Sequence, residues 1–333
     1  MSWTMIRPLR AASDPSLQVT PDIAAGQPLL GFSLGASGTQ RAAVGTGLVW
    51  LGGDFEREQW LLPSVVECAP TADGWWARGG ELMSVAMVRA DRREDDPEPL
   101  AHALYRDLIE RVRSAGFPEL LRIWNFMPGI NHGDGDRERY RRFCIGRGRA
   151  LAEAGLDDSA MCAATAIGSD EGRFRLFALA GRRRGLAIEN PRQVPAWAYP
   201  RRYGPRSPAF ARATALPLAD GRFGLLISGT ASVIGHATAH PGDVLAQADE
   251  AATNVEALIA VAADRLNHPG SCRPGPSSLV RVYVRQPADW PPVEARLRAR
   301  WPEVRLAGLR GDICRRDLLV EIEAWHELNH GRD

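Results

Sequence analysis

Two seven-residue stretches of the chain share one pattern: Arg122-Ile-Trp-Asn-Phe-Met-Pro128 and Arg281-Val-Tyr-Val-Arg-Gln-Pro287. Each reads arginine, an aliphatic residue, an aromatic residue, three further residues and proline. Each comes after a segment whose apolar residues recur at helical spacing, over 100–112 and 244–262. The repeated order of helix and strand indicates an internal duplication.

The elements around these stretches occur in the same order in both parts of the chain. A Gly-rich apolar strand is predicted upstream of each helix, over 45–53 and 224–235. A further helix and a closing strand are predicted downstream, and the closing strands lie at 174–180 and 318–324. We therefore predict an α+β fold of two β-α-β-α-β halves, each of about 130 to 160 residues.

The composition restricts the chemistry. The chain has 333 residues, a formal net charge of +1 and no lysine, so all 41 basic side chains are arginine. Without lysine the chain cannot form a Schiff base, hold pyridoxal phosphate through one, or complete a Walker-type phosphate loop. The balanced charge argues against nucleic acid as a partner. Arginine remains as a cation that binds carboxylates in a bidentate manner.

The chain also lacks the signals of metal, disulfide and membrane chemistry. Its five cysteines are odd in number and form no C-x-x-C pair. His236 and His240 have metal-site spacing, but they precede Pro241 in a predicted loop and lack a third ligand. The N-terminal stretch is not an apolar leader, and no apolar run reaches about 18 residues. We expect a cytoplasmic protein without bound metal or membrane contact.

A helix is predicted over 136–154, and its apolar face includes Tyr140 and Arg147 at i, i+7. A guanidinium on an apolar face is costly unless it is paired. Arg147 beside Tyr140 is therefore a candidate anion clamp. The alternative is that Arg147 forms a structural pair with an internal carboxylate.

A second concentration of arginine and tyrosine occurs in the Pro- and Gly-rich stretch 199–214, which includes Tyr203 and Arg212. Loops on a rigid scaffold commonly carry binding residues. Arginine and tyrosine together suit a ligand with carboxylates and hydroxyls. The alternative is a solvated linker.

The last predicted strand alternates in polarity, with Glu321 and Glu323 on one face and aliphatic residues on the other. Cys314 lies seven residues before Glu321. A thiol and a carboxyl that meet in the fold can both handle protons. The alternative is that Glu321 belongs to a polar outer face.

These motifs resemble those of known families. The C-terminal half resembles the RidA (YjgF) superfamily at 228–230, in the helix 246–255 and at 319–324. The chain as a whole, chiefly over 120–325, resembles the chorismatases, a family of chorismate-cleaving enzymes built on that fold. The segments that carry this second resemblance are 139–147, 190–193, 203–214, 228–232 with 235–236, 240–243, 314–318 and 320–321.

The resemblance implies two tandem RidA/YjgF-like, chorismate-mutase-like β-α-β-α-β halves that form a pseudo-oligomeric core. It places a degenerate N-terminal half at 1–185 and the half with the catalytic glutamate at 186–333. Because two halves are joined in one chain, a monomer or a small homo-oligomer is expected.

The resemblance also implies residue roles, position by position. The implied catalytic residues are Glu321, as the acid, and Cys314, which helps decide the product. Ala231 stands where glycine is expected in strict 3-hydroxybenzoate producers, which allows a mixture of 3- and 4-hydroxybenzoate. No metal or organic cofactor is implied, and the small-molecule partner is chorismate. The implied substrate-binding residues are Tyr140, Arg147, Tyr203, Arg212 and Ala231.

The implied reaction places a demand on Glu321. Pyruvate leaves chorismate after the vinyl CH2 of the enolpyruvyl ether is protonated, which requires a neutral acid. A glutamate with an ordinary pKa of about 4.3 is ionised at pH 7, so Glu321 should be desolvated. The predicted function is cleavage of chorismate to 3-hydroxybenzoate and pyruvate.

Three alternatives remain at this point. The first is hydrolysis of chorismate to trans-3,4-dihydroxycyclohexa-1,5-dienecarboxylate and pyruvate. The second is RidA-type hydrolysis of imines, which needs one carboxylate clamp rather than the two suggested by Arg147 and Arg212. The third is a binding module that has lost the chemistry, against which the presence of Glu321 argues.

Overall fold

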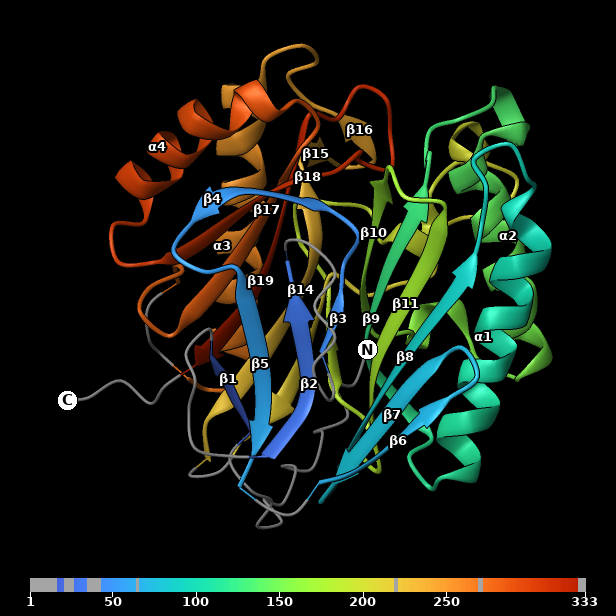
Figure 1. Ribbon diagram of the computed structural model, residues 1–333. Coiled ribbons are helices and arrows are strands. Elements are labelled where there is room, and N and C mark those ends of the chain that lie inside the picture. The colour runs from blue at the N-terminus through green and yellow to red at the C-terminus, as the bar shows by residue number, and fades with distance from the viewer. Residues whose placement is uncertain are drawn as a thin grey trace, which may run out of the picture.

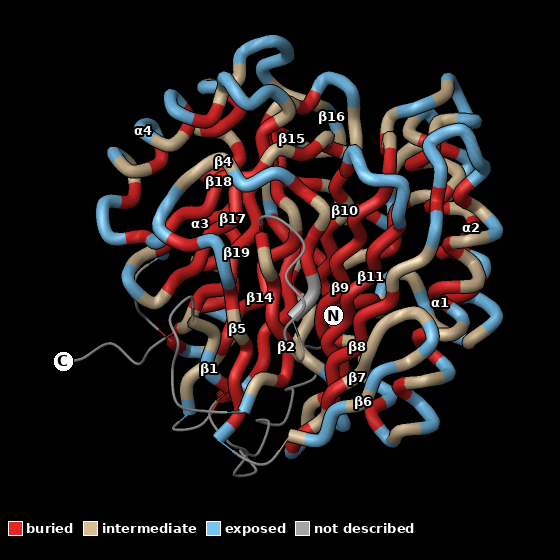
Figure 2. The backbone as a smooth tube through the Cα atoms, in the orientation of Figure 1, coloured by how far each residue is buried: buried red, intermediate tan, exposed pale blue. Residues whose placement is uncertain are grey.

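The computed structural model describes residues 17–20, 27–34, 43–63, 66–218, 221–268 and 272–328. Two large β-sheets face each other, and helices cover the outer side of each (Figure 1). The strands are largely buried, whereas the outer turns of the helices are exposed (Figure 2). The fold is therefore α+β, as predicted. The helices are α1 (Pro97–Ser114) and α2 (Arg139–Glu153) over one sheet, and α3 (Val244–Arg265) and α4 (Trp290–Arg300) over the other.

The first sheet consists of β6 (Glu67–Thr71), β7 (Gly74–Gly79), β8 (Leu82–Ala90), β9 (Glu119–Pro128), β10 (Ala163–Ser169) and β11 (Arg173–Gly181). Its strand order is β10-β9-β11-β8-β7-β6. β9 and β10 are parallel, and β11 is antiparallel to both β9 and β8. α1 connects β8 to β9, and α2 connects β9 to β10.

The second sheet consists of β4 (Val49–Gly53), β12 (Leu186–Ile188), β13 (Ala213–Pro217), β14 (Phe223–Ala231), β17 (Ser278–Val284), β18 (Arg305–Arg310) and β19 (Val320–Leu328). Its order is β12-β13-β14-β19-β17-β18-β4. β17 and β18 are parallel, and β19 is antiparallel to both β17 and β14. α3 connects β14 to β17, and α4 connects β17 to β18.

These connections confirm the predicted duplication. The succession β8-α1-β9-α2-β10-β11 in the first half recurs as β14-α3-β17-α4-β18-β19 in the second. The four strands of each succession also have the same order, β10-β9-β11-β8 in the first sheet and β18-β17-β19-β14 in the second, and the same pairing directions. The two stretches that share the arginine–aromatic pattern lie in β9 and β17, at equivalent places.

The strand predicted upstream of the first helix was placed wrongly. That strand is β8, whereas residues 49–53 form β4, which pairs with β18 at the edge of the second sheet. Gly53 has a positive φ, and a Cβ added there would lie 3.0 Å from the Cα of Ala307. The glycines of this segment therefore permit a close approach between edge strands, rather than marking the counterpart of β14. The boundary at residue 185 stays a prediction, although β4 joins the sheet of the other half.

Two smaller sheets complete the architecture, and the sequence patterns did not predict them. The pair β15 (Val233–Ile234) and β16 (Ala237–Thr238) extends from the end of β14. The other sheet has the order β1-β5-β2-β3, and its strands are β1 (Gln18–Thr20), β2 (Gln27–Ser33), β3 (Ala43–Gly45) and β5 (Arg57–Leu62).

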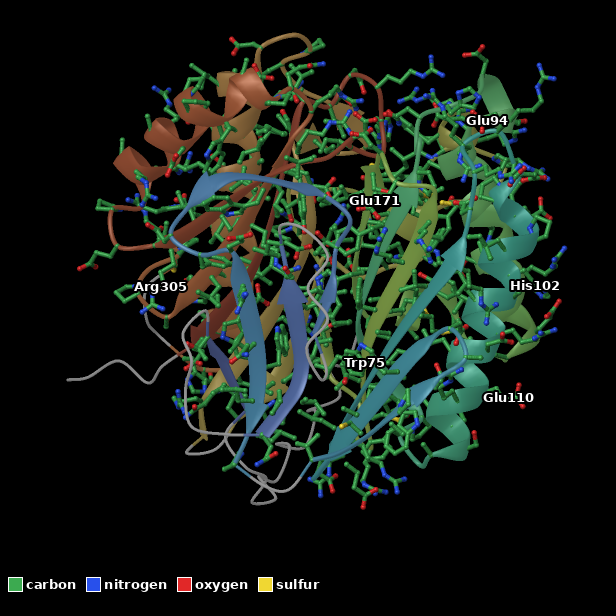
Figure 3. The ribbon with its side chains drawn as sticks, in the orientation of Figure 1. Trp75, Glu94, His102, Glu110, Glu171 and Arg305 are labelled. Carbon is green, nitrogen blue, oxygen red and sulfur yellow. The ribbon has the colours of Figure 1, made fainter. Side chains whose placement is uncertain are left out.

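Apolar side chains pack in three clusters. One lies between the facing sheets, one under α1 and α2, and one under α3 and α4. α1 shows why its sequence folds this way, because Leu104, Leu108 and Val112 repeat every four residues and are fully buried. His102 and Glu110 lie on the outer side of the same helix (Figure 3). No helix in the described part of the chain is long and apolar enough to cross a membrane.

A buried charge cluster joins the facing sheets. Glu323 of β19 accepts hydrogen bonds from Arg281 of β17 and from Arg122 of β9, each at 2.9 Å. Trp124 Nε1 donates to the same carboxylate at 3.1 Å, and Arg281 also donates to Glu58 of β5 at 2.9 Å. Burying charges is tolerable when they are paired and hydrogen-bonded. The cluster therefore fixes the relative positions of three sheets through multi-donor guanidinium groups.

Candidate active site

A cavity of about 380 Å³ lies where α2, the ends of β14 and β19 and the loops 193–212 and 314–318 meet. Both halves of the chain contribute to its wall, because α2 belongs to the first half and the strands belong to the second. Six of the seven residues singled out from the sequence line this cavity. They are Tyr140, Tyr203, Arg212, Ala231, Cys314 and Glu321.

Glu321 faces the cavity because successive side chains of β19 point to opposite faces of the sheet. It pairs in register with Ala231 of β14 and with Tyr283 of β17, and its residue is 4% exposed. Burial, and after it the nearby Glu323, raise the pKa of its carboxyl, whereas Arg122 and Arg212 lower it, and the net result is a pKa of about 8. No ion pair to Glu321 occurs among the described residues. The carboxyl is consequently a neutral acid at pH 7.

Gly229 makes room for this carboxyl. Gly229 lies in β14 where the pairing with β19 is irregular, between Ile227 and Thr230. Regular pairing resumes with Thr230 opposite Ile322. A Cβ added at Gly229 would overlap the Glu321 carboxyl, at 2.7 Å from its Cδ. The sequence motif Ser-Gly-Thr at this point therefore has a direct steric reason.

Cys314 lies in the loop before β19, lines the same cavity as Glu321 and is close enough to interact with its carboxyl. Arg285 holds this loop by donating to the carbonyls of Leu318 at 3.1 Å and Arg315 at 2.9 Å. Burial raises the pKa of the Cys314 thiol to about 12, and the Glu321 carboxyl contributes to that rise. The thiol is therefore protonated at neutral pH and can serve as a proton donor rather than as a thiolate.

Arg212 enters the cavity just before β13. Its NH2 group donates to the Tyr199 hydroxyl at 2.7 Å and to the carbonyl of Val194 at 3.0 Å. Its guanidinium also packs over the ring of Phe210, 5.2 Å from the centroid. The buried Nε of Arg212 has no hydrogen-bond partner among the described residues. An oriented cation with a spare donor is suited to a carboxylate ligand.

Tyr140 brings the first half of the chain to the cavity. It lies near the start of α2 and is 9% exposed. Burial raises the pKa of its hydroxyl well above the ordinary value, and the nearby sulfur groups of Cys144 and Cys314 add to the rise. Its hydroxyl is thus a neutral hydrogen-bonding group at any working pH.

Arg147 does not line the cavity. Its side chain is 2% exposed in the core under α2, with its guanidinium 5.0 Å from the centroid of the Phe143 ring and 4.0 Å from the Cys144 Sγ. The backbone of Arg147 lies about 10.5 Å from that of Tyr140 along the axis. Its guanidinium reaches back along the helix and interacts with Tyr105 and Tyr140 in the core. The alternative is not observed either, since no carboxylate lies within 4.0 Å of Arg147 among the described residues.

Arg315 lines the cavity, and the sequence interpretation did not single it out. Its guanidinium lies 4.0 Å from the ring centroid of Tyr203 and 5.0 Å from that of Tyr199. NH1 donates to the carbonyl of His236 at 2.9 Å. Its adjacency to Cys314 in an arginine-rich segment is the sequence signal that points to it.

Gln193 is a second cavity residue that the interpretation did not single out. Its Nε2 donates to the carbonyl of Val233 at 3.0 Å, while its buried Oε1 has no hydrogen-bond partner among the described residues. An acceptor of this kind can take a hydroxyl donor from a bound ligand.

The two histidines with metal-site spacing have separate partners. His236 Nδ1 lies 2.8 Å from Arg202, and His240 lies 3.6 Å from Glu250. Within the described ranges there is no group of three or more His, Cys, Asp or Glu side chains placed to hold a metal ion.

The two repeats differ at the acid position. In the second half Glu321 lies opposite Tyr283. In the first half the residue opposite the equivalent Trp124 is Phe177, so the first repeat has no acid at that place. By the same comparison, Leu179 stands where the second half has Glu323. Among the described residues, this acid position is therefore filled in the second repeat and not in the first.

The fold and the site define an α+β protein of two fused repeats, with an acid, a thiol and arginines in one cavity at their junction. Residues 58–180 match the family described as chorismatase FkbO/Hyg5-like, N-terminal. A chorismatase from Streptomyces hygroscopicus is 43% identical over 274 residues, which are 80% of this chain and 78% of that protein. The chain therefore belongs to the chorismatase family.

Two further comparisons agree with this assignment. A 3-hydroxybenzoate synthase from Streptomyces hygroscopicus is 44% identical over 229 residues, covering 66% of this chain and 67% of that protein. A chorismatase crystal structure superposes with a TM-score of 0.80 at 32% identity, covering 95% of this chain and 100% of the other. The predicted fold of two tandem halves is confirmed.

Proposed function

We propose that this protein cleaves chorismate to 3-hydroxybenzoate and pyruvate, with Glu321 as the acid that protonates the enolpyruvyl CH2. The observation that carries the proposal is a buried carboxyl with a pKa of about 8 in a cavity of about 380 Å³. That volume falls within the range of small-molecule sites, roughly 300 to 1,000 Å³. The names of the relatives support the same substrate and product.

The first step is proton transfer to carbon. Protonation of the vinyl CH2 develops positive charge on the carbon next to the ether oxygen, and Glu321 becomes a carboxylate. General acid assistance of this kind contributes about 10²- to 10⁴-fold. The carboxylate formed lies beside the cationic centre and stabilises it electrostatically.

Two cations suit the two carboxylates of the substrate. Arg212 offers a buried and oriented guanidinium, and Arg315 supplies a second one that lines the same cavity. Arg315 thereby takes the part that the sequence interpretation gave to Arg147. Tyr140 and Tyr203 add hydroxyls to the wall. Holding both carboxylates places the vinyl carbon against the acid, which removes much of the entropic cost of the reaction.

The product is decided in the step after protonation. Chorismate has the same atoms as a hydroxybenzoate plus pyruvate, so the aromatising route consumes no net water, whereas the route to the dihydrodiol consumes one. Aromatisation requires loss of a ring proton. In the proposed relay, the Cys314 thiol gives its own proton to the Glu321 carboxylate formed in the first step and takes the ring proton, so that both groups return to their neutral forms. Ala231 lies beside Glu321 in register, and its methyl group shifts the ring enough to give some 4-hydroxybenzoate.

The test is incubation with chorismate followed by chromatography of the products. Release of pyruvate together with 3-hydroxybenzoate is expected, with 4-hydroxybenzoate as a minor product. Pyruvate with the dihydrodiol alone would establish the hydrolase alternative. Binding of chorismate without pyruvate would establish a binding module, and turnover of imines alone would establish the RidA-type reaction.

A further inference from the structure

Thr165 lies behind the acid and belongs to the other half of the chain. It is in β10 of the first sheet, is 3% exposed, and does not line the cavity. Its methyl group would lie 3.2 Å from a Cβ at Gly229, the residue that supports the Glu321 carboxyl. Thr165 is thus in the layer directly beneath the acid.

The hydroxyl oxygen of Thr165 engages two donors that lie close to Glu321. Arg122 NH2 donates to it at 2.6 Å, and the backbone N–H of Gly229 donates to it at 2.9 Å. The same Arg122 nitrogen also donates to Glu323 at 2.9 Å. Both donors therefore have acceptors other than the catalytic carboxyl.

We propose that Thr165 is a positioning residue for Glu321, because its hydroxyl oxygen keeps the Arg122 guanidinium and the Gly229 N–H away from the carboxyl. This role rests on the proposed function of Glu321 as an acid. Hydrogen bonds to an ionised carboxylate favour ionisation. An acceptor that occupies the nearby donors therefore favours the protonated acid.

The remaining charged and titratable groups around Glu321 do not provide the same effect. Glu323 on its own strand favours the protonated form, and Arg212 beside β13 favours the ionised form. The Tyr140 hydroxyl and the Cys314 thiol face it as neutral groups, and Tyr283, opposite it on β17, is also neutral because burial raises the pKa of its hydroxyl. Arg122 differs from these groups, because its NH2 donates both to the Thr165 hydroxyl and to the Glu323 carboxylate. Its buried NH1 has no hydrogen-bond partner among the described residues.

Thr165→Val removes the oxygen and keeps the shape of the side chain. Glutamate labelled with carbon-13 at Cδ allows the Glu321 carboxyl to be titrated by NMR, with its signal assigned by its loss in Glu321→Gln. We expect the midpoint to fall by about one pH unit in Thr165→Val, since two donors lose their acceptor and the carboxylate is the neighbouring alternative. Thr165→Ser should restore the midpoint.

Thr214→Val is the matched control. Thr214 is also buried, and its hydroxyl accepts a hydrogen bond from the backbone N–H of Ala163 at 2.8 Å, in the same strand as Thr165. It has no hydrogen bond to the described residues around Glu321. Thr214→Val should lower the melting temperature by a similar amount and leave the Glu321 midpoint unchanged.

Activity provides a second readout. A group with a pKa of about 8 is half protonated at pH 8, and a fall of about one unit leaves about one tenth protonated. We therefore expect kcat at pH 8 to fall about fivefold in Thr165→Val, with KM for chorismate unchanged. An unchanged or raised midpoint in Thr165→Val, the same shift in Thr214→Val, or no recovery in Thr165→Ser would overturn the proposal. The NMR titration decides it even if the wild type releases no pyruvate, which would refute the proposed function instead.

Discussion

Replacing Glu321 by glutamine tests whether the reaction needs the acidic proton of this side chain or only its volume. The amide keeps the volume of the side chain above Gly229 but has no acidic proton to transfer. Because general acid assistance contributes about 10²- to 10⁴-fold, kcat for pyruvate release should fall by at least about a hundredfold. KM should change little, since the arginines that bind the carboxylates are untouched.

The same substitution should increase stability in a pH-dependent manner. The carboxyl has an ordinary pKa of 4.5 in the unfolded chain and about 8 in the folded one. Between these values the unfolded chain releases a proton that the folded chain retains, so the free energy of unfolding of the wild type falls as pH rises. At about 1.4 kcal/mol per pH unit, the accumulated loss above pH 8 is roughly 4 to 5 kcal/mol. Glutamine is neutral at every pH and avoids this loss.

Denaturant unfolding of both proteins at intervals from pH 4 to pH 9 measures this difference. The stability advantage of Glu321→Gln should be small near pH 4, grow through neutral pH and become constant above pH 8. A difference that does not vary with pH would show that Glu321 ionises normally in the folded protein. Turnover close to that of the wild type would independently refute its role as the acid.

Three other substitutions test the walls of the cavity. Cys314→Ala removes the relay for the ring proton and should shift products toward the dihydrodiol; a chromatogram that stays fully aromatic would contradict this role. Gly229→Ala places a methyl group against the Glu321 carboxyl and should lower kcat at least tenfold, while a kcat within twofold of the wild type would show that the carboxyl can move aside. Arg212→Gln removes a charged clamp and should raise KM for chorismate by about tenfold to a hundredfold, corresponding to roughly 1.5 to 3 kcal/mol for a charged hydrogen bond; an unchanged KM would show that the carboxylate is bound elsewhere.

Local pattern was enough to predict the duplication, because helical spacing and the arginine–aromatic strands are repeated at equivalent places in both halves. It was not enough for β4, where Gly52 and Gly53 serve a close edge pairing rather than a central strand. Glycine-rich apolar composition is common to both situations. Whether such a segment becomes a central strand or an edge strand depends on the strands with which it pairs, which lie far away in the sequence.

Local pattern was enough to select residues that line one cavity where a single strand or loop carries them. The alternation of β19 is sufficient to place Glu321 and Glu323 on one face. Arg147 shows the limit, because sharing a helical face with Tyr140 does not determine how far along the axis the cavity extends. The contact between Arg122 and Glu323 spans 201 positions of sequence, and a local pattern contains no information about such a pair.

The first repeat has Phe177 and Leu179 where the second has Glu321 and Glu323, and this asymmetry is one that a fused chain permits. In an assembly of identical subunits every substitution appears in each copy, so a residue needed in one place cannot be discarded in another. Fusing the copies removes that constraint. One repeat could give up its own chemistry and specialise as a wall and support for its neighbour, as Tyr140 and Thr165 do.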